Sequence, residues 1–220
     1  FPRAADLGAG TGAVALLLHR ARILERALLV EAEPSLAELA RSNAEANGLP
    51  DSLDVLCADL REPPPAGWRA CCDLVVANPP YQALGAGRPS PDPLRAAARH
   101  EVRGGLREFA SAAAALLRPG GTFCVIYPWG RREFALEALA AAGFTVRRER
   151  LHRPRDGATP VTVCFEASAG AHAARPRREE LVLHAPTRRF SSVVERFLDG
   201  DYACAARSSA SEIAPRRTTR

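Results

Sequence analysis

The chain has 220 residues, of which 47% are hydrophobic and 25% are charged, and its formal net charge is +5. These values are those of an ordinary globular protein, and no run reaches the roughly 18 apolar residues of a membrane span. No signal-peptide pattern opens the chain, and the six cysteines form no C-x-x-C pair. We therefore expect a cytoplasmic protein with no disulfide framework and no metal, in which Cys57, Cys124 and Cys164 are small buried residues of strands.

All 30 basic residues are arginine, and the isoelectric point is about 9.2. A basic balance favours a nucleic-acid partner, because arginine grips phosphate with a planar, bidentate guanidinium. The chain contains no methionine and begins almost inside its first predicted strand. We therefore expect that an amino-terminal segment is missing from this sequence.

Strand-like and helix-like patterns alternate along the chain, which predicts an α/β fold with a mostly parallel sheet. A first strand over 4–7 runs into the sequence Asp6-Leu7-Gly8-Ala9-Gly10-Thr11-Gly12, and an apolar helix follows over 13–23. Glycines at this spacing permit a tight turn and bring backbone N–H groups close to a ligand at the amino terminus of a helix. A glycine-rich turn by itself would also suit a nicotinamide cofactor.

Acidic residues end the next two predicted strands. The strand over 27–30 ends in Glu31, which lies 19 residues beyond Gly12 and is therefore placed to accept hydrogen bonds from ribose hydroxyls. A helix over 34–47 and a strand over 53–57 follow, and Asp59 comes next, where it can accept from an adenine amino group while Leu60 covers the ring. Either carboxylate could instead be an ordinary solvated group at a strand end.

The fourth strand, over 74–77, ends in Asn78-Pro79-Pro80-Tyr81. The prolines stop the strand because they cannot donate to a sheet ladder, and Asn78 before them is held extended. This arrangement suits capture of a planar –NH2 group, because Asn78 and the Pro79 carbonyl can each accept one N–H while Tyr81 stacks on the attached plane. A strand-terminating turn with a surface tyrosine is the alternative.

The second half of the chain is less informative. A loop over 82–93 is expected to be mobile, and the basic residues beyond it can form either a phosphate-contact surface or a solvated helix face. Helices are predicted up to 117 and over 131–142, strands over 122–127, 145–151 and 161–167, a strand-like piece over 181–184 and an amphipathic segment over 190–198. The last two full strands should be antiparallel, because no helix separates them. The candidate RNA contacts are Arg95, Arg99, His100 and Arg103.

Taken together, the glycine loop, Glu31, Asp59 and Asn78-Pro79-Pro80-Tyr81 resemble the motifs of class I methyltransferases that use S-adenosyl-L-methionine. The resemblance implies a Rossmann-like, seven-stranded sheet with a carboxyl-terminal antiparallel hairpin. It also implies that residues 1–202 form the methyltransferase domain and that 203–220 are a disordered basic tail. The cofactor-binding residues would be Asp6, Gly8, Gly10, Gly12, Glu31, Asp59, Leu60 and Asn78, and the catalytic ones Asn78, Pro79, Pro80 and Tyr81.

Within this resemblance, Asn78-Pro79-Pro80-Tyr81 restricts the group that receives the methyl to adenine N6 or a side-chain amide such as the glutamine of a release factor. Ala98-Arg99-His100-Glu101 and the segment after 180 resemble the bacterial family that methylates adenine N6 at position 37, beside the anticodon of valine tRNA. The glutamine enzymes usually end near the final hairpin. We therefore expect a monomeric enzyme acting on tRNA. A glutamine methyltransferase, an adenine methyltransferase of ribosomal RNA or DNA, and a degenerate cofactor- or RNA-binding module are the alternatives.

Overall fold

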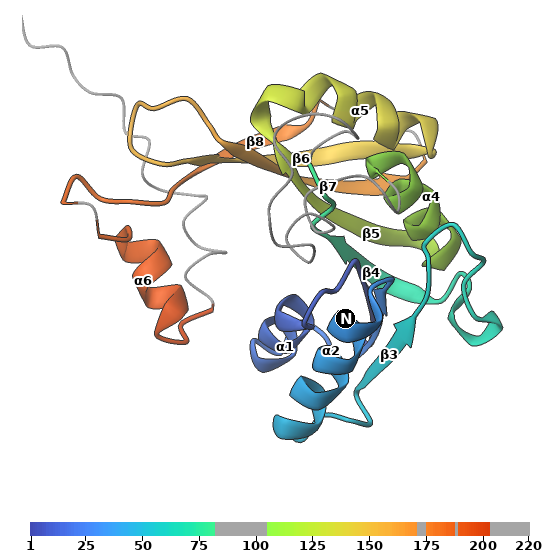
Figure 1. Cartoon of the computed structure of the whole chain (residues 1–220). Coiled ribbons are helices and arrows are strands. Elements are labelled where there is room, and N and C mark those ends of the chain that lie inside the picture. The colour runs from blue at the N-terminus through green and yellow to red at the C-terminus, as the bar shows by residue number, and fades with distance from the viewer. Residues whose placement is uncertain (82–104, 171–174, 188, 203–220) are drawn as a thin grey trace, which may run out of the picture.

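A computed structural model of the chain describes residues 1–81, 105–170, 175–187 and 189–202. Within these ranges, strands and helices alternate as far as β6, and the strands β7 and β8 then follow before the last helix (Figure 1). The helices and strands are β1 (Arg3–Leu7), α1 (Ala13–Arg20), β2 (Arg26–Glu31), α2 (Pro34–Ala46), β3 (Leu53–Cys57), η1 (Ala66–Trp68), β4 (Cys72–Ala77), α4 (Leu106–Leu116), β5 (Leu117–Pro128), η3 (Trp129–Arg131), α5 (Arg132–Ala141), β6 (Phe144–Arg153), β7 (Thr162–Ala169), β8 (Arg177–Val182) and α6 (Ser192–Leu198).

The described strands form one sheet in the order β3-β2-β1-β4-β5-β7-β6-β8. Strands β1 to β5 are parallel to one another, and β7 is antiparallel to both β5 and β6. The α/β fold and the final antiparallel pair predicted from the sequence are thus confirmed. The described part of the chain contains no helix long and apolar enough to cross a membrane.

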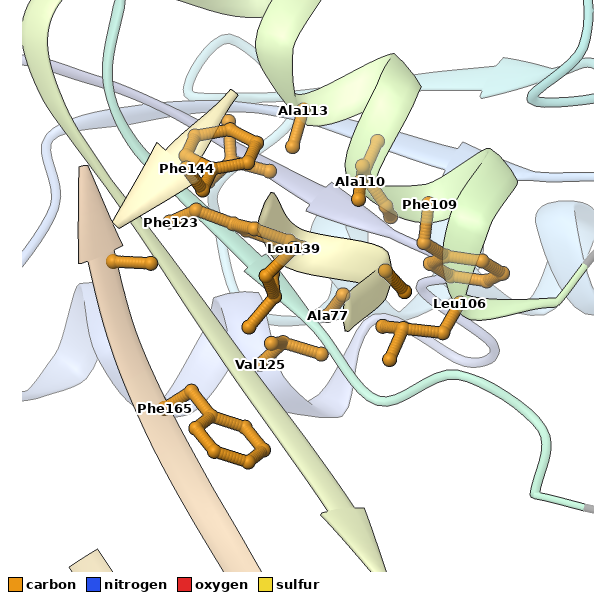
Figure 2. Packing of buried hydrophobic residues seen from close by; sticks show 14 of the residues in the cluster. Ala77, Leu106, Phe109, Ala110, Ala113, Phe123, Val125, Leu139, Phe144 and Phe165 are labelled. Carbon is orange, nitrogen blue, oxygen red and sulfur yellow. The ribbon is translucent and has the colours of Figure 1, made fainter. Parts of the chain in front are cut away.

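Helices cover the sheet from both sides, with α1 and α2 on one face and α4 and α5 on the other (Figure 1). On α4, Leu106, Phe109, Ala110, Ala113 and Leu116 are buried. They recur at the three- and four-residue spacing that places side chains on one side of a helix. Figure 2 shows the part of this row from Leu106 to Ala113, together with labelled side chains of β5 and α5. Burying each of the larger side chains contributes about 1.5–3 kcal/mol, so this layer anchors the end of β4 and the loops around it.

Three expectations need correction. The sheet has an eighth strand among the described residues, because Arg177–Val182 pairs in parallel with β6. Strand β5 begins at Leu117 and not at 122, since Leu117 pairs with Cys72 before an irregularity in the ladder. Cys57 is exposed because it is the last residue of β3, which is the edge strand. The loop expected over 82–93 and the tail expected over 203–220 lie outside the described ranges.

Candidate active site

The carboxyl ends of three neighbouring strands bring the predicted motifs to one edge of the sheet. Leu7, the last residue of β1, pairs with Val30 of β2 on one side and with Ala77 of β4 on the other. The residues that follow these partners therefore lie side by side: the glycine loop after β1, Glu31 at the end of β2 and Asn78 after β4. This edge is where open α/β sheets bind their ligands.

Two glycines of the loop are required by the backbone and by close packing. Gly8 has φ +66°, and a Cβ there would come within 3.0 Å of the Phe109 ring. Gly12 has φ +78°, and a Cβ there would come within 3.0 Å of the Leu29 side chain. A side chain would be strained at either position and would push the loop off α4 or the sheet. At Gly10, with φ +56°, a Cβ would meet no atom within 4 Å, so the loop is open on that side.

The Glu31 carboxylate is held in a defined orientation by backbone donors. Its Oε2 accepts the N–H of Gly10 at 2.8 Å, and its Oε1 accepts the N–H of Glu33 at 2.8 Å. Each carboxylate oxygen has a further lone pair, so the group can still accept hydrogen bonds from a ligand. Glu31, which is predicted to accept hydrogen bonds from ribose hydroxyls, is therefore held by a hydrogen bond from the glycine loop itself.

Asp6 is a buried carboxylate at the foot of the loop, and the residue is only 3% exposed. It accepts the backbone N–H of Ala15 in the first turn of α1, while its Oδ2 has no hydrogen-bond partner among the described residues. Burial raises the pKa of Asp6 from 3.8 to about 7, the hydrogen bond from Ala15 opposes this rise, and the nearby Glu31 carboxylate adds to it. A buried carboxylate oxygen without a donor suits a positively charged ligand group.

Asp59 and Leu60 lie at the same edge, after β3, but their side chains are already engaged. Arg61 donates to Asp59 from Nε at 2.9 Å and from Nη2 at 2.5 Å. Leu60 is half-buried and lines a pocket of about 30 Å³ with Val30 and Leu56. An adenine amino group would therefore have to share the Asp59 carboxylate with Arg61.

The motif after β4 has an internal hydrogen bond. Asn78 is exposed and Pro79 is buried, and the Tyr81 hydroxyl donates to the Asn78 Oδ1. The Tyr81 ring packs edge-on against the buried Tyr127, with ring centroids 5.7 Å apart and an interplanar angle of 90°. Burial, together with nearby Cys164, raises the pKa of Tyr81, so its hydroxyl keeps the proton that it donates. The amide oxygen of Asn78 still has a second lone pair for another donor.

Sequence reasoning missed one residue at this edge. Arg131, at the end of η3, donates from Nη1 to the backbone carbonyl of Tyr81 at 2.6 Å. No motif marks it, and its only signal in the sequence was its position a few residues beyond β5, the strand next to β4. The four candidate RNA contacts, Arg95, Arg99, His100 and Arg103, lie outside the described residues.

Comparison with known families decides the class of this site. The model of the methyltransferase small domain family matches residues 1–138, which include the glycine loop, both acids and Asn78 to Tyr81. The chain belongs to this family. The resemblance to class I methyltransferases is therefore confirmed, and the methyl donor that it implies is S-adenosyl-L-methionine.

Two curated relatives of this chain have names that give different methyl acceptors. A tRNA1(Val) (adenine(37)-N6)-methyltransferase of Bacteroides fragilis is 29% identical over 158 residues, which cover 72% of this chain and 65% of the relative. A release factor glutamine methyltransferase of Mycolicibacterium smegmatis is 34% identical over 161 residues, covering 68% and 56%. This chain thus spans less than two thirds of the length of either relative.

The fold is also that of solved methyltransferase structures. A predicted O-methyltransferase from Agrobacterium tumefaciens matches with a TM-score of 0.67 at 23% identity, over 90% of this chain and 89% of that one. The residues of this methyltransferase fit the donor, because the buried Asp6 Oδ2 has no hydrogen-bond partner among the described residues and the loop is open at Gly10, where a Cβ would meet no atom within 4 Å. An open loop beside a buried carboxylate oxygen without a donor suits a cationic ligand group.

Proposed function

We propose that this chain methylates the exocyclic N6 of an adenine in tRNA, namely adenine 37, 3′ to the anticodon of valine tRNA. The observation that carries the proposal is the exposed Asn78 amide at the end of β4, beside the glycine loop and bonded to Tyr81. The tRNA1(Val) relative supports the choice of acceptor. The chain also continues past β7 into β8 and α6, as the resemblance to the tRNA enzymes implies.

The donor would be held by residues of three strand ends. The backbone of the glycine loop would lie along it, Glu31 would accept from its ribose hydroxyls, and Asp6 would face its positively charged amino group. When bound, S-adenosyl-L-methionine would supply a methyl group on a sulfonium centre: the acceptor nitrogen would bond to the methyl carbon as its bond to sulfur breaks, and S-adenosyl-L-homocysteine would be the leaving group. The task left to the protein is to orient that amine.

Asn78 and Pro79 would orient the acceptor amine. The lone pair of adenine N6 is delocalised into the ring, so the free amine is a poor nucleophile. Hydrogen bonds from its two N–H groups to the Asn78 side chain and the Pro79 carbonyl would favour a pyramidal nitrogen whose lone pair is directed at the methyl group. Positioning and fixed dipoles of this kind supply most of the rate enhancement, and no dedicated base is needed because the product ammonium loses its proton readily to water.

Tyr81 would form the stacking surface for the base. An adenine in a structured loop has to leave its stack to enter a pocket, and aromatic side chains stabilise the flipped base. The ring of Tyr81 is half-buried and its edge-on contact with Tyr127 fixes its plane. A base stacked on it would bring its amino group towards Asn78.

The test is methyl transfer from labelled S-adenosyl-L-methionine to unmodified bulk tRNA, followed by nucleoside analysis. The proposal expects N6-methyladenosine in the valine-accepting fraction. It expects Asn78→Ala and Tyr81→Ala to lower kcat about 100-fold or more, while the Kd for S-adenosyl-L-homocysteine changes less than about threefold. Loss of donor affinity in both variants would instead assign these residues to the donor site. If tRNA is labelled but contains no N6-methyladenosine, the assignment of adenine N6 as the acceptor atom is refuted.

A glutamine acceptor is the second candidate, because the release factor relative has the higher identity of the two. A glutamine side chain also presents a planar –NH2 group, so Asn78 and Pro79 would hold it in the same way. Incubation with a release factor and with tRNA in parallel separates the two. Label in protein that resists ribonuclease would transfer the assignment to glutamine, and label in ribosomal RNA or DNA would keep the adenine chemistry on another nucleic acid.

A further inference from the structure

We propose that Arg131 is a positioning residue of this site, which holds the Tyr81 backbone and thereby sets where the Tyr81 ring lies. The inference rests on the proposed function in that it assigns the Tyr81 ring to the substrate base. Arg131 belongs to none of the motifs that identify the family. Its contact with Tyr81 spans 50 residues of sequence, from the turn after β5 to the turn after β4.

The contact is short and partly buried. The Arg131 guanidinium donates to the Tyr81 carbonyl at 2.6 Å, and a charged donor makes a stronger hydrogen bond to a carbonyl than a neutral one does. The Pro79-Pro80 pair has no backbone N–H with which to tie this turn to the sheet. A side-chain donor from the neighbouring strand end therefore supplies a restraint that the ladder cannot.

Aromatic rings hold the guanidinium itself in place. Its Cζ lies 4.7 Å from the ring centroid of Phe134 and 5.4 Å from that of Tyr127. The Tyr127 and Phe134 rings are stacked on each other at 6.2 Å, and Tyr127 is fully buried. Cation–π attraction fixes a guanidinium well when the rings beneath it cannot move. Tyr127 thus contacts both the Arg131 guanidinium and the Tyr81 ring. The same buried ring therefore supports Tyr81 twice: directly at its ring, and through Arg131 at its backbone carbonyl.

The turn that carries Arg131 is tied to the sheet on its other side. The N–H of Trp129 donates to the Val161 carbonyl at 3.0 Å, just before β7. Arg132 donates to the buried Glu149 of β6 from Nη2 at 2.6 Å and from Nε at 2.9 Å. The two adjacent arginines therefore have different tasks: Arg132 fastens the turn to β6, and Arg131 reaches across to the loop after β4.

The matched substitutions are Arg131→Ala, Arg131→Lys and Arg26→Ala. Arg26 lies at the start of β2, at the opposite end of the strands, and its partner Asp54 is exposed, so Arg26→Ala removes the same charge without touching the site. We expect Arg131→Ala to lower kcat about tenfold, with the melting temperature and the Kd for S-adenosyl-L-homocysteine close to those of the parent. Arg131→Lys, which can still donate to the carbonyl, should recover several-fold of this loss, and Arg26→Ala should leave kcat unchanged.

A second readout does not depend on which acceptor is methylated. The chain has three tyrosines, so the protein labelled with 3-fluorotyrosine gives three ¹⁹F resonances, and the Tyr81→Phe variant identifies that of Tyr81. We expect Arg131→Ala to shift and broaden the Tyr81 resonance, while that of Tyr202 stays unchanged in all variants. An unchanged Tyr81 resonance in Arg131→Ala would overturn the proposal even if the acceptor is correct.

The two readouts separate the proposals from each other. If tRNA proves not to be the acceptor, the proposed function fails, and the fluorine spectrum still decides whether Arg131 positions Tyr81. A kcat within about twofold of the parent in Arg131→Ala, measured with the true acceptor, would also overturn the inference. A displaced Tyr81 resonance together with a lowered kcat, and partial rescue by lysine, would establish it.

Discussion

The hydroxyl of Tyr81 donates to the side-chain oxygen of Asn78, so the two groups expected to meet the substrate are bonded to each other. Tyr81→Phe removes this hydrogen bond and keeps the ring against Tyr127. One neutral hydrogen bond is worth about 0.5–1.5 kcal/mol, so a less restrained Asn78 amide should lower kcat roughly two- to tenfold. Steady-state kinetics checks this, with an unchanged Kd for S-adenosyl-L-homocysteine as the control. A loss as large as that of Tyr81→Ala would mean that the hydroxyl, and not the ring, is the essential part.

Glu31→Gln should weaken the donor site. The carboxylate accepts two backbone N–H groups, and an amide can present an oxygen to only one of them. Hydrogen bonds to a charged group are worth about 1.5–3 kcal/mol, so we expect the Kd for S-adenosyl-L-homocysteine to rise about tenfold or more by calorimetry. Glu38→Gln is the matched control, since Glu38 is 71% exposed on α2. This variant should bind the donor as tightly as the parent does. Equal affinities in the two variants would contradict the assigned role.

Asp6→Asn should change how stability depends on pH. Because folding raises the pKa of Asp6 from 3.8 to about 7, the folded chain binds more protons than the unfolded chain over this range. The stability that Asp6 contributes therefore falls as pH rises from about 4 to 7 and stays low above that. An amide does not titrate, so relative to the parent the variant should gain on the order of 2 kcal/mol in the free energy of unfolding between about pH 5 and pH 8. Urea unfolding at the two pH values measures it.

The same substitution should weaken donor binding, since the amide cannot neutralise a cationic group. For the parent, the affinity for S-adenosyl-L-homocysteine should rise between about pH 5.5 and pH 7.5 as Asp6 ionises, and Asp6→Asn should lose this dependence. Parallel pH profiles for the two proteins, in either unfolding or binding, would show that Asp6 does not titrate near neutrality.

Glu149→Gln should destabilise the fold without acting at the site directly. Glu149 is 1% exposed and pairs with Arg132, which is 15% exposed. Removing the Glu149 charge leaves Arg132 with only the exposed Glu133 as a charged partner, and we expect a loss of about 3 kcal/mol in the free energy of unfolding. Glu133→Gln removes the other carboxylate on Arg132, but Glu133 is 80% exposed, so its loss should be under about 1 kcal/mol. Similar losses of unfolding free energy in Glu149→Gln and Glu133→Gln would contradict the expectation that the buried ion pair contributes more than the exposed one.

Much of the site could be predicted from short stretches of sequence, because local backbone chemistry dictates it. Gly8 and Gly12 have the positive φ values that their tight turn requires, and the prolines end β4 directly after Ala77. The spacing of Glu31 from the loop placed it at the end of β2, next to Gly10. In each case the residue type at a fixed distance from a strand end is itself the signal.

Contacts between distant segments could not be predicted in this way. Nothing in either stretch indicates that Arg131 donates to the Tyr81 carbonyl 50 residues earlier, or that Arg132 pairs with Glu149 on β6. The charged strand β8 was placed only as a strand-like piece over 181–184, because its partner β6 lies far earlier in the chain and no apolar alternation marks its start. Side-chain hydrogen bonds of this kind depend on three-dimensional proximity, which spacing along the chain does not encode.

Local patterns in the sequence therefore predicted most of the strands and helices and the sheet edge that carries the glycine loop, Glu31 and Asn78, since turns, strand ends and glycine spacing are local properties. The donor was predicted from the family resemblance that these motifs carry. The tertiary structure decided how the site is held. It buried Asp6 and so raised its pKa, and it brought Arg131 from beyond β5 to the carbonyl of Tyr81. Desolvation and long-range hydrogen bonds arise only when the sheet brings its strand ends together, and for that reason they are absent from any single stretch of the chain.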